Sequence, residues 1–232
     1  MKHASICIVL AAAVLLLLAG CASVPYSPRI VPEDFVGTID NRFMLLEPGT
    51  KFVYQGISDE GRERNEVFVT RETRVVMGVR CVVVKDTVWL NGELTEDTYD
   101  WFAQDKQGNV WYFGEDSREY KKGQLVSTEG SWEAGIDGAL PGIIMKADPK
   151  VGESYRQEYY AGEAEDMAEI VALEEGVSVP GGSFTGCLKT IEWTPLEPGV
   201  AEYKYYAPKV GVVLETVRGS RERMELVEID KE

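Results

Sequence analysis

The sequence predicts a mainly β protein, in which a curved antiparallel sheet forms a sandwich or a partial barrel built from two similar halves. Three observations lead to this prediction. The body of the chain consists of short runs rich in Val, Thr, Tyr and Trp, separated by turn dipeptides such as Asn91-Gly92 and Gly181-Gly182. No clear helical stretch lies between these runs. Landmark residues also recur in the same order along the two halves.

The strand-like runs lie at 67–76, 79–90, 109–115, 154–160, 167–179, 187–193 and 203–207. Their regular spacing favours an antiparallel sheet that curls on itself. One segment is ambiguous, because the apolar spacing between Gly162 and Gly176 also permits a helix. The Val and Ile residues and the flanking glycines favour a strand there.

The internal repeat is predicted from four landmarks in each half. They are Gly49, Phe52, Cys81 and Ala103 in the first half, and Gly152, Tyr155, Cys187 and Ala207 in the second. Cys81 precedes Ala103 by 22 positions, and Cys187 precedes Ala207 by 20. This spacing predicts a single β domain over 47–232, with halves at about 47–130 and 148–232 and a connection at 131–147.

The N-terminus is typical of a secretory signal. Lys2 precedes an apolar run from Ile6 to Gly20, which is shorter than the roughly 20 residues that span a membrane. The run ends in Leu18-Ala19-Gly20-Cys21, which resembles the lipobox of bacterial lipoprotein precursors. The resemblance implies cleavage after residue 20 and acylation of Cys21. An ordinary signal peptide or an uncleaved anchor is the alternative.

The residues after Cys21 bear on where the mature protein is held. Residues 21–46 contain three prolines in SVPYSPRIVPED and are predicted to form a lipidated N-terminus and an extended tether. In lipoproteins of enterobacterial type, a residue such as Ala22, rather than Asp, implies transfer to the outer membrane. We therefore expect a lipid-anchored protein on the exported side, with the outer membrane facing the periplasm favoured over the inner membrane.

The charge of the chain excludes some partners. The formal net charge is −15, and it becomes −16 when the signal segment is removed with Lys2. Such a chain is repelled by nucleic acid, and no basic cluster offsets the field. The expected partners are the membrane, through the acyl chains, and an envelope protein, a lipid or a glycan.

The stretch from Asp100 to Asp116 combines aromatic and acidic residues in a predicted hairpin. The residues from Asp105 to Asn109 favour a turn, and the flanking aromatics favour core positions. A ligand surface is the alternative, and its candidate residues are Trp101, Asp105, Trp111 and Trp132. The segment YYAPKVGVV also resembles late hairpins of uncharacterised β-rich bacterial envelope proteins, which implies a fold and no activity.

Catalysis by histidine is excluded in a mature chain that begins at Cys21, because the one histidine is His3. We therefore predict no catalytic centre, no metal and no cofactor. A carboxylate-dependent glycan hydrolase is the alternative. Its candidate acids lie near Trp101 and Trp111, and they are Asp97, Asp100, Asp105, Glu115 and Asp116.

Two cysteines remain after the lipidated one, namely Cys81 and Cys187. Export favours a disulfide between them, whereas their apolar surroundings are equally typical of buried thiols. The connection at 131–147 is predicted to lie against the sheet as a buried crossover, with a cover over a ligand site as the alternative. Together these observations predict an envelope lipoprotein with a binding or scaffolding role, for a hydrophobic or glycan ligand or a partner protein.

Overall fold

The computed structural model describes residues 25–231, and strands account for most of them. The helical element in this range is the short 3-10 helix η1 (Pro32–Asp34). Within the same range, no helix has the length and apolar character needed to cross a membrane.

The first half of the chain forms a meander of long antiparallel strands. These strands are β4 (Thr50–Ser58), β5 (Gly61–Val76), β6 (Val79–Leu90), β7 (Glu93–Asp105) and β8 (Val110–Asp116), each paired with the next. Tight turns join them. Asn91 and Gly92 connect β6 to β7 with φ values of 52° and 87°, which suit the two-residue turns that match strand twist.

The second half forms another antiparallel meander. Its strands are β13 (Ser154–Arg156), β14 (Glu158–Tyr159), β15 (Met167–Val179), β16 (Gly182–Trp193), β17 (Glu202–Ala207), β18 (Gly211–Val217) and β19 (Arg223–Lys231). The segment for which a helix was the alternative is therefore a strand, β15.

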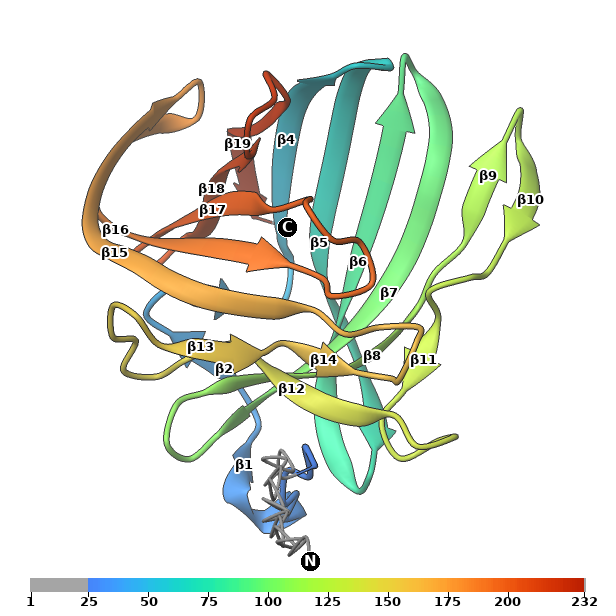
Figure 1. Ribbon diagram of the computed structural model, residues 1–232, viewed down its shortest axis with the longest axis vertical. Helices are drawn as coiled ribbons and strands as arrows, with labels where there is room; N and C mark the ends of the chain where they lie inside the picture. Colours follow the sequence, from blue (N-terminus) through green and yellow to red (C-terminus); the bar gives the residue numbers. More distant parts are fainter. Residues whose placement is uncertain (1–24, 232) are drawn as a thin grey trace, which may run out of the picture.

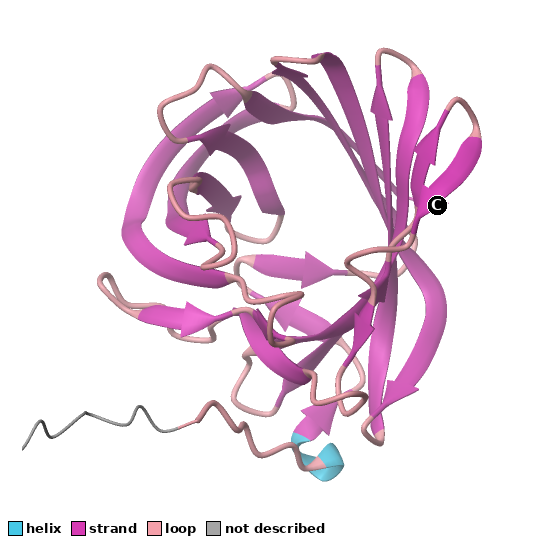
Figure 2. Ribbon diagram, turned by 45° about the vertical axis from the view of Figure 1, so that its right-hand side comes forward, coloured by secondary structure: helices cyan, strands magenta, loops and turns pink. Residues whose placement is uncertain are grey.

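The two meanders join on both sides, so the sheet nearly closes into a barrel (Figure 1). On one side β19 pairs with β4, with Leu226 opposite Tyr54. On the other side β12 (Leu140–Met145) pairs with both β8 and β14. The ring of strands is visible in Figure 2. The predicted partial barrel is confirmed, and the sandwich alternative is not formed.

The connection at 131–147 belongs to the sheet and does not cover it. It forms β11 (Trp132–Glu133), which pairs with β8, and then β12. Gly142 lies opposite Tyr112, and a Cβ atom added at Gly142 would meet the backbone of Gln157 at 2.2 Å. A residue without a side chain at this position lets β12 approach the second meander closely.

The predicted tether is wrong for residues 26–46, because they pack on the barrel. The hydroxyl of Tyr26 donates to the carbonyl of Pro141 at 2.8 Å. The segment then forms η1, β1 (Phe35–Val36) paired with β7, and the hairpin of β2 (Ile39–Asn41) and β3 (Met44–Leu46). Ile39 and Phe43 are in the core. The burial of these apolar side chains outweighs the preference of the prolines for a free extended chain.

The landmarks of the predicted repeat lie in equivalent places of the two meanders. Cys81 is in β6 and Cys187 in β16, and both are fully buried. Gly49 N donates to Val69 O at 2.8 Å with φ 90°, and Gly152 N donates to Ile170 O at 2.9 Å with φ 85°. The duplication itself stays a prediction.

Candidate ligand cavity

A cavity of about 450 Å³ lies inside the barrel and is lined by both meanders. Part of its lining is apolar, and the residues are Met44, Leu45, Leu46, Phe52, Val67, Val84, Phe102, Ile144, Val210, Val212 and Met224. The polar part consists of Tyr54, Asn65, Asp86, Asp100, Tyr112, Glu115, Gln157, Glu158, Asp166, Glu192, Lys204, Tyr206 and Glu215. Its volume is in the usual range for small-molecule sites.

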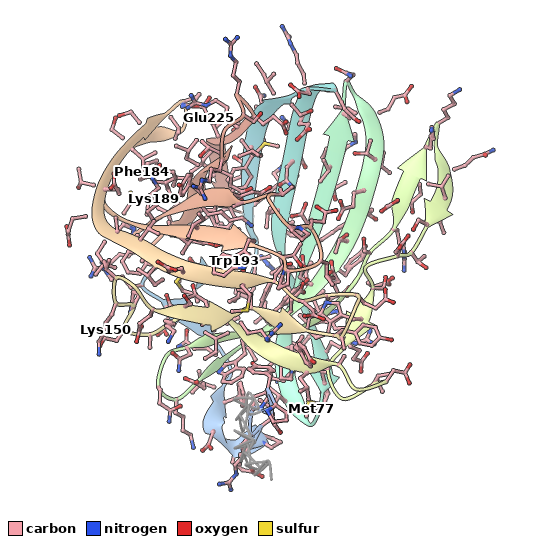
Figure 3. All side chains as sticks on the ribbon, in the orientation of Figure 1. Met77, Lys150, Phe184, Lys189, Trp193 and Glu225 are labelled. Carbon is pink, nitrogen blue, oxygen red and sulfur yellow. The ribbon has the colours of Figure 1, made fainter. Side chains whose placement is uncertain are left out.

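The apolar and polar residues are ordered along the barrel axis. We call the end with the turns at Ser58–Gly61 and Leu90–Glu93 the upper end, and the end with the turn at Val76–Val79 the lower end. Met77 is at the lower end in Figure 3 and Glu225 near the upper end. Each strand from β4 to β7 contributes one apolar and one polar residue to the lining, two positions apart. In every case the polar residue is the one nearer the upper end. The pairs, apolar residue first, are Phe52 and Tyr54, Val67 and Asn65, Val84 and Asp86, and Phe102 and Asp100.

This order follows from the strand period of two. Residues two positions apart on a strand face the same side of the sheet, so both members of each pair face the interior. Each pair places an apolar side chain below a polar one. On β4 to β7, the polar residue of each pair is therefore nearer the upper end than its apolar partner.

Four carboxyl groups of the first meander and β14 form the acidic arc of the cavity: Asp86, Asp100, Glu115 and Glu158. Burial raises the pKa of Asp100 to about 7, although the hydroxyl of Tyr112, which donates to Oδ1 at 2.6 Å, lowers it. Burial also raises the pKa of Glu115 to about 9, and repulsion from Asp100 and Glu158 adds to the effect.

The other two acids of the arc behave in the same way. Burial, with repulsion from Asp100, raises the pKa of Asp86 well above its ordinary value, although Asn65 Nδ2 donates to Oδ1 at 2.6 Å. Burial, with repulsion from Asp166, raises the pKa of Glu158 to about 7. Burial and neighbouring carboxyl groups raise these pKa values, and hydrogen bonds lower them.

The second meander supplies a basic residue, Lys204 on β17. Its Nζ lies 3.3 Å from Oε2 of Glu192, and its backbone is opposite Glu215 on β18. The attraction of Glu192 and then of Glu215 raises the pKa of Lys204 well above its ordinary value. Glu192 also accepts hydrogen bonds from Thr190 at 2.7 Å and from Tyr206 at 2.8 Å. Lys204 therefore offsets part of the negative charge on this side of the cavity, which Glu192, Glu215 and Asp166 supply.

Two buried polar atoms at the cavity have no hydrogen-bond partner, namely Nε2 of Gln157 and Oδ1 of Asn65. The Gln157 residue is 3% exposed. A buried amide without a partner costs about 1–3 kcal/mol, so such groups in a cavity are available to a ligand.

A smaller hollow of about 130 Å³ adjoins the cavity at the upper end. It shares Glu215 and Met224 with the cavity, and its further lining includes Glu63, Glu202, Glu222 and Arg223. The acidic character of the cavity therefore continues toward the molecular surface.

A metal centre is not indicated by the geometry of these acids. Across residues 25–231, no group of three or more His, Cys, Asp or Glu side chains is placed to hold a metal ion.

The four residues predicted as a possible ligand surface do not line the cavity. Trp101 is 4% exposed, and Arg74 lies over its ring at 4.0 Å from the centroid. Asp105 is buried and accepts a hydrogen bond of 2.8 Å from Nε1 of Trp111. Trp132 is buried edge-on against Tyr112. These side chains make contacts within the hairpin and the core.

Two of the five acids named from the sequence, Asp100 and Glu115, do line the cavity. The other three make local contacts. Asp97 forms an ion pair with Lys85, Asp105 binds Trp111, and Asp116 pairs with Arg118.

Sequence reasoning missed Asp86, Glu158, Glu192, Lys204 and Glu215, which also line the cavity. A usable signal exists on β6, because Asp86 lies two positions from Val84 on the face that points inward. The sequence alone does not show which face of a strand becomes the interior of a barrel.

Of the two alternatives for the cysteine pair, the structure contains the buried thiols. Cys81 and Cys187 are both free, so the possible disulfide is not formed. Cys81 is near the start of β6 and Cys187 is in the middle of β16, and both side chains are fully buried in the two different meanders. Cys21, the predicted lipidation site, lies outside the described residues.

Comparisons with known proteins found no related sequence and two solved structures of low similarity. No family model matches the chain, and no curated protein sequence matches it. One similar solved structure is that of a protein inferred to be exported, with a YmcC-like fold, from Bacteroides fragilis: 16% identity, TM-score 0.49, 82% of this chain and 100% of that one. Another is a protein inferred to be a lipoprotein from Parabacteroides distasonis: 14% identity, TM-score 0.46, 82% of this chain and 99% of that one. We rest no argument on likeness at this level.

Proposed function

We propose that the protein is a membrane-anchored envelope lipoprotein that binds a small ligand inside its barrel and catalyses no reaction. The observation that carries the binding role is the cavity of about 450 Å³, in which the polar residues of β4 to β7 lie nearer the upper end than the apolar ones. The anchor rests on the lipobox and Cys21. Ala22 supports the outer membrane, on its periplasmic side, as the destination.

The anchor would hold the barrel close to the bilayer. Cys21 precedes Tyr26 by five positions, and the hydroxyl of Tyr26 donates a hydrogen bond to the carbonyl of Pro141. Five residues span at most about 18 Å when fully extended. The N-terminal segment also passes the lower end, because a Cβ atom at Gly78 would lie 3.1 Å from Pro32. The acidic upper end of the cavity is the end remote from this segment.

The glycan hydrolase alternative gains no support at the place where it was expected. Trp101 is buried beneath Arg74, and Trp111 is bonded to Asp105, so the two rings do not form an open sugar platform. Asp100 and Glu115 line the cavity inside the barrel instead. We therefore do not adopt a hydrolase as a second function.

Ligand binding is tested with the neutral apolar fluorophore N-phenyl-1-naphthylamine. The chain from Ala22 contains the whole described barrel and is used for the titration. Val67→Trp places a large ring in the cavity, whereas Val75→Trp changes an outer position of the same strand, which is 66% exposed. We expect enhanced emission with the parent chain and with Val75→Trp, and at least tenfold weaker binding to Val67→Trp. Equal binding by all three would contradict the cavity as the site.

Lipidation is tested separately by intact mass and radiolabelled palmitate incorporation in a bacterial host. Cys21→Ala should abolish acylation and release the protein from the membrane fraction. Cys7→Ala is the matched control, because it removes a thiol from the predicted signal and leaves the lipobox unchanged. Incorporation of palmitate by Cys21→Ala would overturn the anchor.

A further inference from the structure

We propose that the cavity selects an organic cation with an apolar tail, whose ammonium group lies at the acidic arc and whose tail fills the lower part. This inference rests on the proposed function and names the chemical class of its ligand. It is carried by the distribution of charge in the cavity, by the order of the lining residues along β4 to β7 and by two buried amide atoms without hydrogen-bond partners.

The charge distribution is uneven. Lys204 is the one lysine or arginine among the described residues that line the cavity, and it is engaged by Glu192 and Glu215. The acidic arc of Asp86, Asp100, Glu115 and Glu158 lies on the other meander and on β14. Buried charges in proteins are normally paired, because their desolvation is costly. Burial keeps the acids of the arc partly protonated while no cation is paired with them, and their charged forms are complementary to a positively charged ligand group.

The geometry favours an organic cation over a metal ion. In the range 25–231 no three of the acids converge on a point that could hold a metal. The acids are spread over β6, β7, β8 and β14 instead. An ammonium group with several N–H donors can bind carboxylates from more than one direction.

The lower part of the cavity accounts for the tail. Phe52, Val67, Val84 and Phe102 face the interior directly below the polar residues of the same strands. Each methylene group buried among such side chains contributes a favourable transfer free energy. The ligand is therefore amphiphilic, with its charged end toward the upper end of the barrel and its apolar tail toward the lower end.

The two buried amides point to further polar contacts of the same ligand. Oδ1 of Asn65 is an acceptor without a donor, and Asn65 lies beside Asp86, to which its Nδ2 group donates. An ammonium N–H would satisfy that acceptor. Nε2 of Gln157 is a donor without an acceptor, and it would suit a hydroxyl or carbonyl oxygen near the cationic group.

The approach to the cavity has the same charge preference. The adjoining hollow at the upper end is lined by Glu63, Glu202 and Glu222, with Arg223 as the basic residue of its lining. An acidic entrance raises the local concentration of cations and disfavours anions.

The test compares three probes with the same chain length and different end groups: octylammonium, 1-octanol and octanoate. Each is titrated by calorimetry into the chain from Ala22 at pH 8, in phosphate buffer, which contains no organic cation. We expect octylammonium to bind at least tenfold more tightly than 1-octanol, and octanoate to bind most weakly. Butylammonium should bind at least tenfold more weakly than octylammonium, because its tail is shorter.

Two double variants test whether the acidic arc causes the preference for a cation. Asp100→Asn combined with Glu115→Gln should weaken octylammonium binding at least tenfold and leave 1-octanol binding unchanged. The matched control is Glu197→Gln combined with Glu228→Gln, which removes two charges from exposed positions. The control should bind all probes as the parent chain does, and circular dichroism verifies that both double variants fold.

The outcomes separate this inference from the proposed function. Equal binding of octylammonium and 1-octanol would overturn the cation preference and leave ligand binding in the barrel intact. Tighter binding of octanoate would overturn it as well. Binding of N-phenyl-1-naphthylamine that Val67→Trp does not weaken would instead overturn the cavity as the site, and with it this inference.

Discussion

The hydroxyl of Tyr112 on β8 donates a hydrogen bond of 2.6 Å to Oδ1 of Asp100 on β7, at the cavity. The bond favours the charged form of a carboxyl group that burial would otherwise keep protonated. It therefore sets how much negative charge the acidic arc carries near neutral pH.

Tyr112→Phe should raise the pKa of Asp100 above its value of about 7, because the donor that lowers it is lost. The variant should also lose about 1.5–3 kcal/mol of unfolding free energy at pH 8, where the carboxyl is charged, and less at pH 5. Carboxyl carbon chemical shifts report the pKa, and urea denaturation reports the stability. Tyr203→Phe, at a half-buried tyrosine on β17, is the control. An unchanged Asp100 titration would contradict this role of the hydrogen bond.

Glu115→Gln should make the protein more stable at high pH. The pKa of Glu115 is raised to about 9 by burial and by Asp100, Glu158 and Glu96, and the nearby hydroxyl of Tyr112 opposes the shift. In the unfolded chain a glutamate titrates near about 4.3. Between these values the folded state binds the extra proton, so stability falls as pH rises from about 4 toward about 9. The amide removes this dependence.

The measurement is the melting temperature from pH 5 to pH 9 in buffers free of organic amines, since a bound cation would mask the effect. We expect Glu115→Gln to exceed the parent chain by about 4 °C at pH 9 and to match it at pH 5. Glu228→Gln, on the surface, should follow the parent chain throughout. If the melting temperatures of Glu115→Gln and of the parent chain changed with pH in parallel, Glu115 would not be the titrating group.

Lys204→Met should destabilise the protein strongly, because it leaves Glu192 and Glu215 without their cation. Removing one partner of a buried pair costs about 3–5 kcal/mol. The side chains of Lys204 and Glu192 are 28% and 9% exposed, whereas those of the Lys231–Glu47 pair are 66% and 56% exposed. Lys231→Met should therefore change the unfolding free energy by less than about 1 kcal/mol. Equal losses in urea denaturation would mean that the Lys204 pair is not buried.

The thiols of Cys81 and Cys187 should be unreactive in the folded protein and both reactive after unfolding. Burial raises the pKa of the Cys81 thiol to about 12, so little thiolate is present. Iodoacetamide added without reductant to the chain from Ala22 should give no adduct in buffer and two adducts in urea. Two adducts that form only after reduction would instead identify a disulfide.

Gly142→Ala should loosen the junction between the meanders. The added Cβ atom would lie 2.2 Å from the backbone of Gln157, so β12 and the second meander must separate. We expect a loss of about 1–3 kcal/mol in urea denaturation. Gly176→Ala is the matched control, because a Cβ atom at Gly176, on β15, meets nothing within 4 Å. Similar stabilities of the two variants would contradict the close approach at Gly142.

Much of the fold was predictable, because strand formation depends on local patterns. The run at 79–90 and the run at 167–179 are β6 and β15 with the same bounds, since Val-rich segments between turn residues favour extended backbone wherever they pack. The tether was not predictable from its prolines. Ile39, Phe43 and Leu46 are buried there, and burial depends on partners that are distant in sequence.

The candidate site was likewise predictable only in part. The sequence by itself determined the acidic charge, the absence of histidine after His3 and the β architecture, and it predicts the signal and the lipobox, because each depends on composition or on neighbouring residues. Only the tertiary structure decided which acids are functional candidates. Asp100 and Asp97 are three positions apart on β7, yet Asp100 lines the cavity and Asp97 pairs with Lys85. The pairing of β19 with β4 closes the sheet and so decides which side of each strand faces the interior. That pairing joins residues that lie near opposite ends of the domain in the sequence.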